Sequence, residues 1–430
     1  MKIEIPEEDS KYMYNFIGNI VDEIGPRMPG SEGEEKAAKI IKKELEEKCE
    51  CDEVSIEPFK FHPRAFLGWI KIDVILIIIS LTLFFLIPVF QTNPNFHIIT
   101  IILSSISVGL NLIAFLFLWN EFFSYKEYID RLFKEEESQN VIGKIKAKNE
   151  LEKIIIFSGH HDSALQFNLL QYLNWGYVII IFIGLGIVFL WIGVSIIHLI
   201  LSIFGYYTIF NTLVFWFTII GSPAMVGLFF FVSFGESANK VPGAVDNLSS
   251  VAIVLGLGRY LKKHLEIIPG NTEIRLISFG SEEAGLRGAY RYAARHLDEL
   301  KKFNAEVVNM DGIMSINAIQ ILENEPTTRT RHSKEIVKKV LDAAELVEVP
   351  IKKFGAGLIE RVGGIISGGT DAAAFSKAGV KATNIMAMEF KKFASFYHQT
   401  TDTLDKIEKG SLEVILSILI GYLINESKSN

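Results

Sequence analysis

The chain has 430 residues, with 43 basic and 50 acidic side chains and a formal net charge of -7. The charges are distributed unevenly, because residues 74–120 and 163–235 contain no Asp, Glu, Lys or Arg. This distribution argues against a purely soluble protein, a disordered chain and a transporter embedded throughout its length. The acidic balance gives no basic surface for nucleic acid.

The N-terminal region is predicted to belong to a soluble domain. Its first residues, MKIEIPEEDSKYMYNF, have no apolar core after a basic patch, so we expect no signal peptide. Residues 32–48 are predicted to form an amphipathic helix, with apolar side chains at Ala37, Ile40, Ile41 and Leu45. The only cysteines, Cys49 and Cys51, are too few for a disulfide framework or a structural zinc site.

Each uncharged stretch is predicted to form a hairpin of two transmembrane helices. A span needs about 20 apolar residues. In the first stretch, a polar turn with proline at 91–95 separates spans near 68–90 and 96–119. The second stretch is densely apolar over 177–234, which has room for two long spans or three short ones, with a turn expected at 205–208.

The basic residues near these spans predict their orientation. Neither turn contains Lys or Arg, whereas the opposite ends carry Arg64, Lys71, Lys126, Arg131 and Lys134. Because positive charge marks the cytoplasmic side, we expect a multi-pass integral membrane protein with cytoplasmic termini and a cytoplasmic soluble domain. His198 lies in the third span, where it could line a polar path, although a packed or interfacial histidine is the simpler interpretation.

Outside the spans, the pattern is α/β. Four short apolar runs bounded by turn residues predict strands buried on both faces, at Ile154–Phe157, Ile274–Phe279, Val307–Met310 and Thr383–Met388. Helical patterns occupy 248–263, 286–300, 333–346 and 411–425, and the last is interpreted as a core helix instead of a fifth span. This order predicts a mixed, mostly parallel central sheet flanked by helices.

Imidazoles and carboxylates follow the predicted strands. In such sheets a ligand binds beyond the carboxyl ends of the strands. The residues at these ends include His160, Asp162, Glu282, Glu283, Asp311, Tyr397 and His398, and Asp246 precedes the helix that begins near Leu248. A mixed set of imidazoles and carboxylates suits zinc or another borderline divalent metal, whereas oxygen ligands alone would suit magnesium or calcium.

These residues carry a family resemblance. The chain resembles the two-zinc aminopeptidases of peptidase family M28, a zinc-exopeptidase-like fold, over nearly all of its soluble sequence. The matching segments are Gly25-Pro26-Arg27…Gly30-Ser31-Glu32-Gly33, Ser138-Gln139-Asn140-Val141, His160-His161-Asp162-Ser163, Gly243-Ala244-Val245-Asp246-Asn247, Glu282-Glu283-Ala284-Gly285…Gly288, Asn309-Met310-Asp311 and Tyr397-His398-Gln399-Thr400-Thr401-Asp402-Thr403.

The resemblance implies a role for each residue of the site. It implies that Asp246 bridges two Zn²⁺ ions, with Co²⁺ or Mn²⁺ as alternative metals. His160 and Asp311 would complete one metal site, and Glu283 and His398 the other. Three further residues would act in catalysis: Glu282 as general base to a metal-bound hydroxide, Asp162 as the partner of the other ring nitrogen of His160, and Tyr397 as a donor to the oxyanion.

The chain departs from the family in its two inserted hairpins. We expect a peptidase domain built from residues 1–66, 121–172 and 236–430, interrupted by hairpins at 67–120 and 173–235. His160 and Asp246 must reach one metal pair, so each insertion needs an even number of spans, which favours two plus two. In addition, Asp371-Ala372 stands where relatives often have Asp-His.

The short linkers also predict the substrate. Residues 163–176 and 235–245 limit the distance from the metals to the bilayer surface to about 20–45 Å, at about 1.5 Å per helical or about 3.3 Å per extended residue. We therefore expect apolar peptides as substrates and the lipid bilayer as a partner. The sequence does not fix the oligomeric state, and a homodimer is one of the states that it allows.

The favoured function is a membrane-anchored metallo-exopeptidase that removes N-terminal residues, but other readings stay open. On the same fold, a carboxypeptidase would need a cation for the terminal carboxylate, for which Arg361 is a candidate, and a glutaminyl cyclase would bind one metal. A catalytically inactive receptor or scaffold is the alternative of another class. The complete donor set and Glu282 argue against that alternative.

Overall fold

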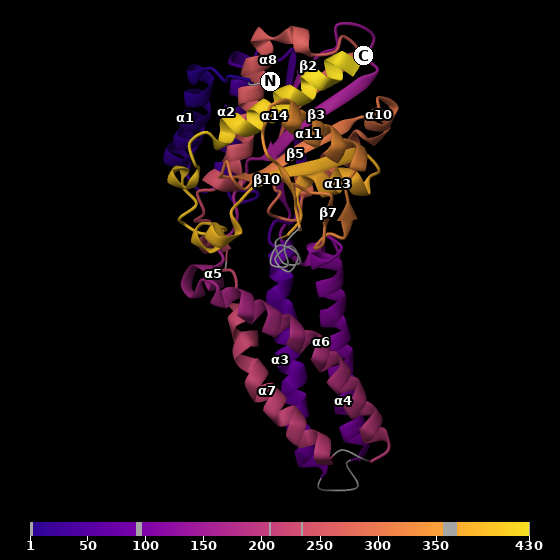
Figure 1. The fold of residues 1–430 in the computed structure, drawn as a ribbon. Helices are drawn as coiled ribbons and strands as arrows, with labels where there is room; N and C mark the ends of the chain where they lie inside the picture. The colour runs from indigo at the N-terminus through magenta and orange to yellow at the C-terminus, as the bar shows by residue number, and fades with distance from the viewer. Residues whose placement is uncertain (1–2, 92–96, 206–207, 234, 356–367, 430) are drawn as a thin grey trace. The chain divides into compact units, whose positions relative to one another are not determined.

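A mixed β-sheet of eight strands positions the donor residues. The computed structural model describes residues 3–91, 97–205, 208–233, 235–355 and 368–429 (Figure 1). Within them, the strand order is β1-β2-β4-β3-β5-β10-β6-β9, and β4, β3, β5 and β10 are parallel to one another. The strands are β1 (Glu53–Phe61), β2 (Glu136–Ile145), β3 (Lys153–His160), β4 (Thr272–Phe279), β5 (Glu306–Ile313), β6 (Gln320–Ile321), β9 (Lys352–Lys353) and β10 (Lys381–Ala387). A separate pair comprises β7 (Asn324–Glu325) and β8 (Thr330–Arg331).

Helices bury both faces of the central strands. Successive side chains of a strand point to opposite faces, and in β3 Ile155 and Phe157 pack in one core whereas Ile154 and Ile156 pack in the other. The first core includes side chains of α1 (Glu7–Glu23), α2 (Glu32–Glu47), α8 (Ser249–Lys263), α11 (Lys334–Leu346) and α14 (Ser411–Ser429). The second core includes side chains of α9 (Arg287–Arg295), α10 (Leu297–Lys302) and α13 (Asp371–Lys377).

The α/β part of the predicted fold class is confirmed: the structure is a mixed α/β fold with a mostly parallel central sheet and flanking helices. The four predicted strands coincide with β3, β4, β5 and β10. The single helix expected over 286–300 is wrong, because His296 has non-helical backbone angles and separates α9 from α10. Edge strand β1 was not predicted, since its half-exposed, charged sequence lacks an apolar run.

The chain divides into two units. The sheet unit comprises residues 1–63, 134–166 and 236–430, and the helical unit comprises residues 64–133 and 167–235. Residues 121–133 and 167–172 thus belong to the helical unit, whereas the sequence assigned them to the peptidase domain.

The helical unit is formed by long apolar helices. They are α3 (Ala65–Gln91), α4 (His97–Phe117), α6 (Gly176–Ile203) and α7 (Thr208–Phe229), with the short α5 (Asn168–Leu173). Among the described residues, three helical segments are long and apolar enough to cross a membrane, namely Ala65–Ile87, His97–Phe122 and Gly176–Ile203. The predicted turns at 91–95 and 205–208 lie largely outside the described residues.

Small polar side chains lie inside the helical unit. His198 is fully buried, and its Nδ1 lies 3.1 Å from Ser104 Oγ and 3.3 Å from Ser202 Oγ. The indole of Trp191 donates to Ser80 Oγ at 3.1 Å. These contacts link α6 to α4 and α3, so His198 is a packed histidine in this unit.

Gly288 lies so close to Gly280 and Asn140 that we predict no larger residue fits at this position. A Cβ on Gly288 would lie 2.2 Å from Gly280 O and 2.4 Å from Asn140 Oδ1. We expect Gly288→Ala to destabilise the protein by about 1–3 kcal/mol, seen as a lower thermal unfolding midpoint in detergent.

Gly18→Ala in α1 is the matched control, because its Cβ would meet only Leu404 Cδ2 at 3.4 Å. Alanine is favoured in a helix by roughly 0.5–1 kcal/mol, so this variant should be neutral or slightly more stable. An unchanged midpoint for Gly288→Ala would contradict the packing described here.

Candidate metal centre

The carboxyl ends of the central strands bring the predicted donors together. His160 ends β3, Glu282 and Glu283 follow β4, and Asp311 lies near the end of β5. Asp246 lies in a turn, Ala244–Leu248, that leads directly into α8. His398 lies in the loop after β10. Its φ is positive, at 50°, a backbone conformation that costs free energy for any residue other than glycine.

The Asp246 carboxylate lies between two imidazoles. Its Oδ1 is 3.3 Å from His160 Nε2, and its Oδ2 is 3.3 Å from His398 Nε2. Glu283 Oε1 lies 3.4 Å from the same nitrogen of His398. On the other side, His160 Nε2 is 3.8 Å from Glu282 Oε2 and 3.9 Å from Asp311 Oδ1.

The donor set fits a metal ion. Two groups have ligand atoms within 4.8 Å of one another: His160, Asp246 and Glu283 form one, and His160, Glu282 and Asp311 form the other. In the described part of the chain, His160 Nε2 and Glu283 Oε1 are buried without a hydrogen-bond partner, a costly arrangement that a coordinated cation would satisfy. Mixed nitrogen and oxygen donors of this kind suit zinc.

The electrostatics of the centre also favour a cation. Burial, reinforced by Glu283, Asp311 and Asp371, raises the pKa of Glu282 well above its usual range. Burial and the nearby Asp246 raise the pKa of Asp311 in the same direction. Burial opposes protonation of His398, yet Glu283 and Asp246 raise its pKa to about 9. The centre thus concentrates negative charge, and a bound cation would relieve the repulsion between its carboxylates.

Buried carboxylates hold the backbone of the donor loops. Asp162 Oδ1 lies 3.4 Å from Nδ1 of His160. Its two oxygens also accept hydrogen bonds from the backbone N–H groups of Glu282 and Glu283 at 3.1 and 3.0 Å. Glu34 of α2 accepts from the N–H and the hydroxyl of Ser281 at 2.8 and 2.9 Å. Ser281 has a positive φ of 55°, so these bonds fix a strained turn directly before Glu282.

Two further acids were not assigned a role from the sequence. Asp402 accepts hydrogen bonds from Val245 N at 2.8 Å and from Asp246 N at 3.1 Å. It lies in the same sequence motif as His398, and this position is the sequence feature that could have indicated its role. Asp371 is fully buried at the start of α13, and burial raises its pKa to about 8. In the sequence, Asp371 is distinguished only as the residue before Ala372.

The remaining predicted residues have different outcomes. Tyr397 stacks on the imidazole of His398 with ring centroids 3.8 Å apart, and it stacks on Phe393 at 4.0 Å. Arg361, the candidate cation of a carboxypeptidase, and most of the glycine-rich run over 362–370 lie outside the described residues.

Comparisons with known proteins match part of the chain to peptidases. Residues 231–423 match the model of peptidase family M28. Aminopeptidase YwaD of Bacillus subtilis (strain 168) is 30% identical over 183 residues, a match that covers 41% of this chain. The match spans only 36% of the length of that curated relative.

Solved structures share the fold. BSAP, a zinc aminopeptidase from Bacillus subtilis, is 16% identical with a TM-score of 0.55, and the match covers 99% of this chain and 96% of that chain. A glutaminyl cyclase from Fimbriiglobus ruber is 12% identical with a TM-score of 0.53, and the match covers 99% of this chain and 96% of that chain. At these identities, the likeness concerns the fold alone.

The backbone contacts predict that Asp402 sets metal affinity without binding metal. In Asp402→Asn, an amide N–H would face the N–H of Asp246 or Val245, and the Asp246 loop would lose one of its two acceptors. We expect zinc affinity to fall about tenfold to hundredfold, as measured by competition with a chelating dye. Asp405→Asn, an exposed neighbour, is the matched control and should bind zinc like the wild type. Equal affinity of Asp402→Asn and the control would refute this role.

Proposed function

We propose that the protein is a membrane-anchored aminopeptidase that holds two zinc ions and removes N-terminal residues from peptides. The observation that carries this proposal is the Asp246 carboxylate, which has one oxygen 3.3 Å from His160 and the other 3.3 Å from His398. His160 and Asp311 would hold one ion, and Glu283 and His398 the other, with Asp246 shared. When bound, zinc would activate water and polarise the scissile carbonyl as a Lewis acid.

Glu282 is the proposed general base. Its carboxylate is nearly buried, and its Oε2 lies 3.8 Å from Nε2 of His160, within reach of a water held at the metal centre. It would accept a proton from the attacking water and then donate that proton to the amine that leaves as the peptide bond breaks. The bonds from Ser281 N to Glu34 and from Glu282 N to Asp162 hold its backbone in place.

Tyr397 is the proposed donor to the oxygen of the attacked carbonyl. The stacking of its ring on His398 fixes the ring beside the donor set. Negative charge develops on the carbonyl oxygen during attack, and a fixed hydroxyl donor stabilises that charge without reorganisation.

A glutaminyl cyclase is the second candidate. The structural likeness to such an enzyme supports it. One ion would need no more than three donors, and His160, Asp246 and Glu283 form such a group by themselves. A substrate panel distinguishes the two functions: amino-acid nitroanilides, a substrate with N-terminal glutamine, and an N-blocked peptide with a free C-terminus. The aminopeptidase proposal predicts chelator-sensitive cleavage of the nitroanilides, whereas cyclisation of glutamine alone, or C-terminal cleavage alone, would contradict it.

Glu282→Gln tests the base directly. Glutamine keeps the size of the side chain but cannot accept the proton, so we expect kcat to fall about 10²- to 10⁴-fold with the metal content unchanged by elemental analysis. Glu266→Gln, at an exposed glutamate of the sheet unit, is the control and should keep full activity. Retained activity in Glu282→Gln with both metals present would eliminate Glu282 as the base.

Membrane anchoring is the other part of the proposal. It is supported by the three apolar helical segments and by the absence of charge from residues 208–229 of α7. We expect the full chain to stay in the membrane fraction after an alkaline carbonate wash and to be released by detergent. Release by carbonate alone would show peripheral association. Apolar peptides stay the proposed substrates, and the panel should therefore include N-terminal Leu and Phe beside Lys and Glu.

A further inference from the structure

The insertion of residues 167–235 separates two donor loops of the sheet unit along the chain. His160 and Asp246 lie 3.3 Å apart, yet the chain leaves the sheet unit after residue 166 and returns at residue 236. The two ends of the insertion, residues 161–166 and 236–245, must therefore be joined by contacts within the sheet unit.

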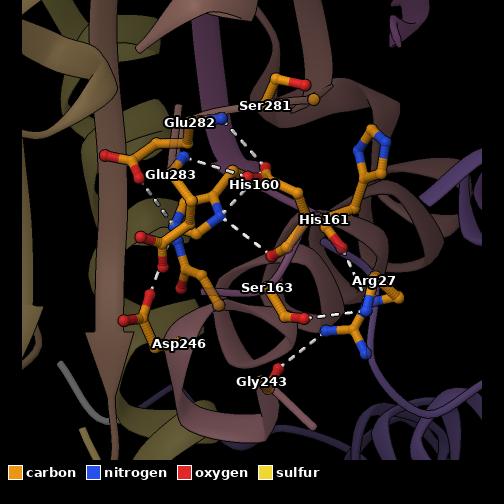
Figure 2. A network of polar contacts seen from close by, with 12 residues as sticks. Arg27, His160, His161, Ser163, Gly243, Asp246, Ser281, Glu282 and Glu283 are labelled. Carbon is orange, nitrogen blue, oxygen red and sulfur yellow. Dashed lines mark hydrogen bonds and ion pairs between the residues drawn. The ribbon is translucent and has the colours of Figure 1, made fainter. Parts of the chain in front are cut away.

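Arg27 makes these contacts. Its Nε donates to His161 O at 2.7 Å, next to His160. Its Nη1 donates to Pro242 O at 2.6 Å, and its Nη2 donates to Gly243 O at 3.0 Å, in the loop before Asp246. Figure 2 shows the guanidinium between the two loops. One planar side chain thus binds the carbonyl groups of both ends of the insertion.

The backbone of Arg27 adds two contacts on the His160 side. Its N–H donates to Ser163 Oγ at 2.8 Å, and its carbonyl oxygen accepts from Ser163 N at 3.0 Å. Arg27 is fully buried, a location that costs a guanidinium its hydration unless its N–H groups are satisfied. Each of its three nitrogens donates to a backbone carbonyl, which meets that demand.

The loop before Asp246 has a glycine, Gly243, where it contacts the guanidinium of Arg27. Gly243 has a positive φ of 63°, and a Cβ there would lie 2.8 Å from Arg27 Nη2 and 2.7 Å from Ser163 Cβ. The glycine therefore allows the returning chain to approach the guanidinium and the Ser163 loop together.

We propose that Arg27 is a positioning residue that joins both ends of the inserted segment and thereby holds His160 and Asp246 at the separation that metal binding requires. This inference rests on the proposed metal centre. Lysine cannot replace Arg27, because one ammonium group cannot reach carbonyls on both loops with the planar fork of a guanidinium. Other contacts also join the ends, including Met28 N to Asn239 Oδ1 at 3.1 Å and Gln166 N to Ala238 O at 2.9 Å, so the fold should survive the loss of the guanidinium.

Metal affinity of the full chain in detergent tests the proposal. Arg27→Lys and Arg27→Ala should both raise the Kd for zinc about tenfold to hundredfold, and the absorption bands of bound Co²⁺ should change. Added guanidinium at millimolar concentration should restore affinity to Arg27→Ala, because it can occupy the space that the side chain leaves. It should not restore Arg27→Lys, whose side chain fills that space.

Arg259→Ala is the matched control. This arginine lies in α8, after Asp246, and pairs with Asp9 at 2.8 Å, away from the donor set. It should keep the wild-type Kd for zinc even where its thermal midpoint falls. If Arg27→Ala does not fold, Arg27→Lys carries the test, since it keeps the charge and most of the volume.

Three results would overturn the inference: wild-type zinc affinity in both Arg27 variants, an equal loss in Arg259→Ala, or no recovery of Arg27→Ala with guanidinium. The wild-type chain tests the proposed function independently of the Arg27 variants. A wild-type protein that binds zinc but cleaves no nitroanilide refutes the aminopeptidase and leaves the role of Arg27 intact. A wild-type protein that binds no zinc refutes the centre itself.

Discussion

The position of one carboxylate, Asp246, between His160 and His398 is the constraint on which the rest of the structure depends. A carboxylate held 3.3 Å from each imidazole can be shared by two cations only if its backbone is fixed. Asp402 fixes that backbone from one side by accepting from the N–H of Asp246. The donors opposite are held in the same way, because Asp162 accepts from the N–H groups of both glutamates. Buried acids thus orient the acids of the centre.

The inserted apolar segments make this arrangement harder to maintain. In an uninterrupted domain, His160 and Asp246 would be joined by a short loop, whereas here residues 167–235 belong to another unit. The N-terminal segment supplies the missing connection, since Arg27 contacts both ends of this insertion and Glu34 binds Ser281 and the hydroxyl of Ser138, which follows the first insertion. A motif that precedes every donor in the sequence therefore contacts the loops of His160, Asp246 and Glu282.

Sequence patterns predicted the parts of the fold that depend on local information. The apolar runs of β3, β4, β5 and β10 identify buried strands, and the polar residues after them identify the donor edge. The antiparallel strand β1 was missed because polar residues interrupt its apolar ones, and the break at His296 was missed because a local helical pattern continues through it. The roles of Glu34, Asp402 and Arg27 could not be read locally, since each acts on backbone atoms far away in the chain.

Anomalous diffraction at the zinc absorption edge, from crystals of the full chain grown with zinc, tests the shared carboxylate most directly. Two peaks are expected, one bound by His160, Asp311 and one oxygen of Asp246, and the other bound by Glu283, His398 and the second oxygen of Asp246. A single peak, or two peaks of which only one contacts Asp246, would contradict the dinuclear centre proposed for this protein.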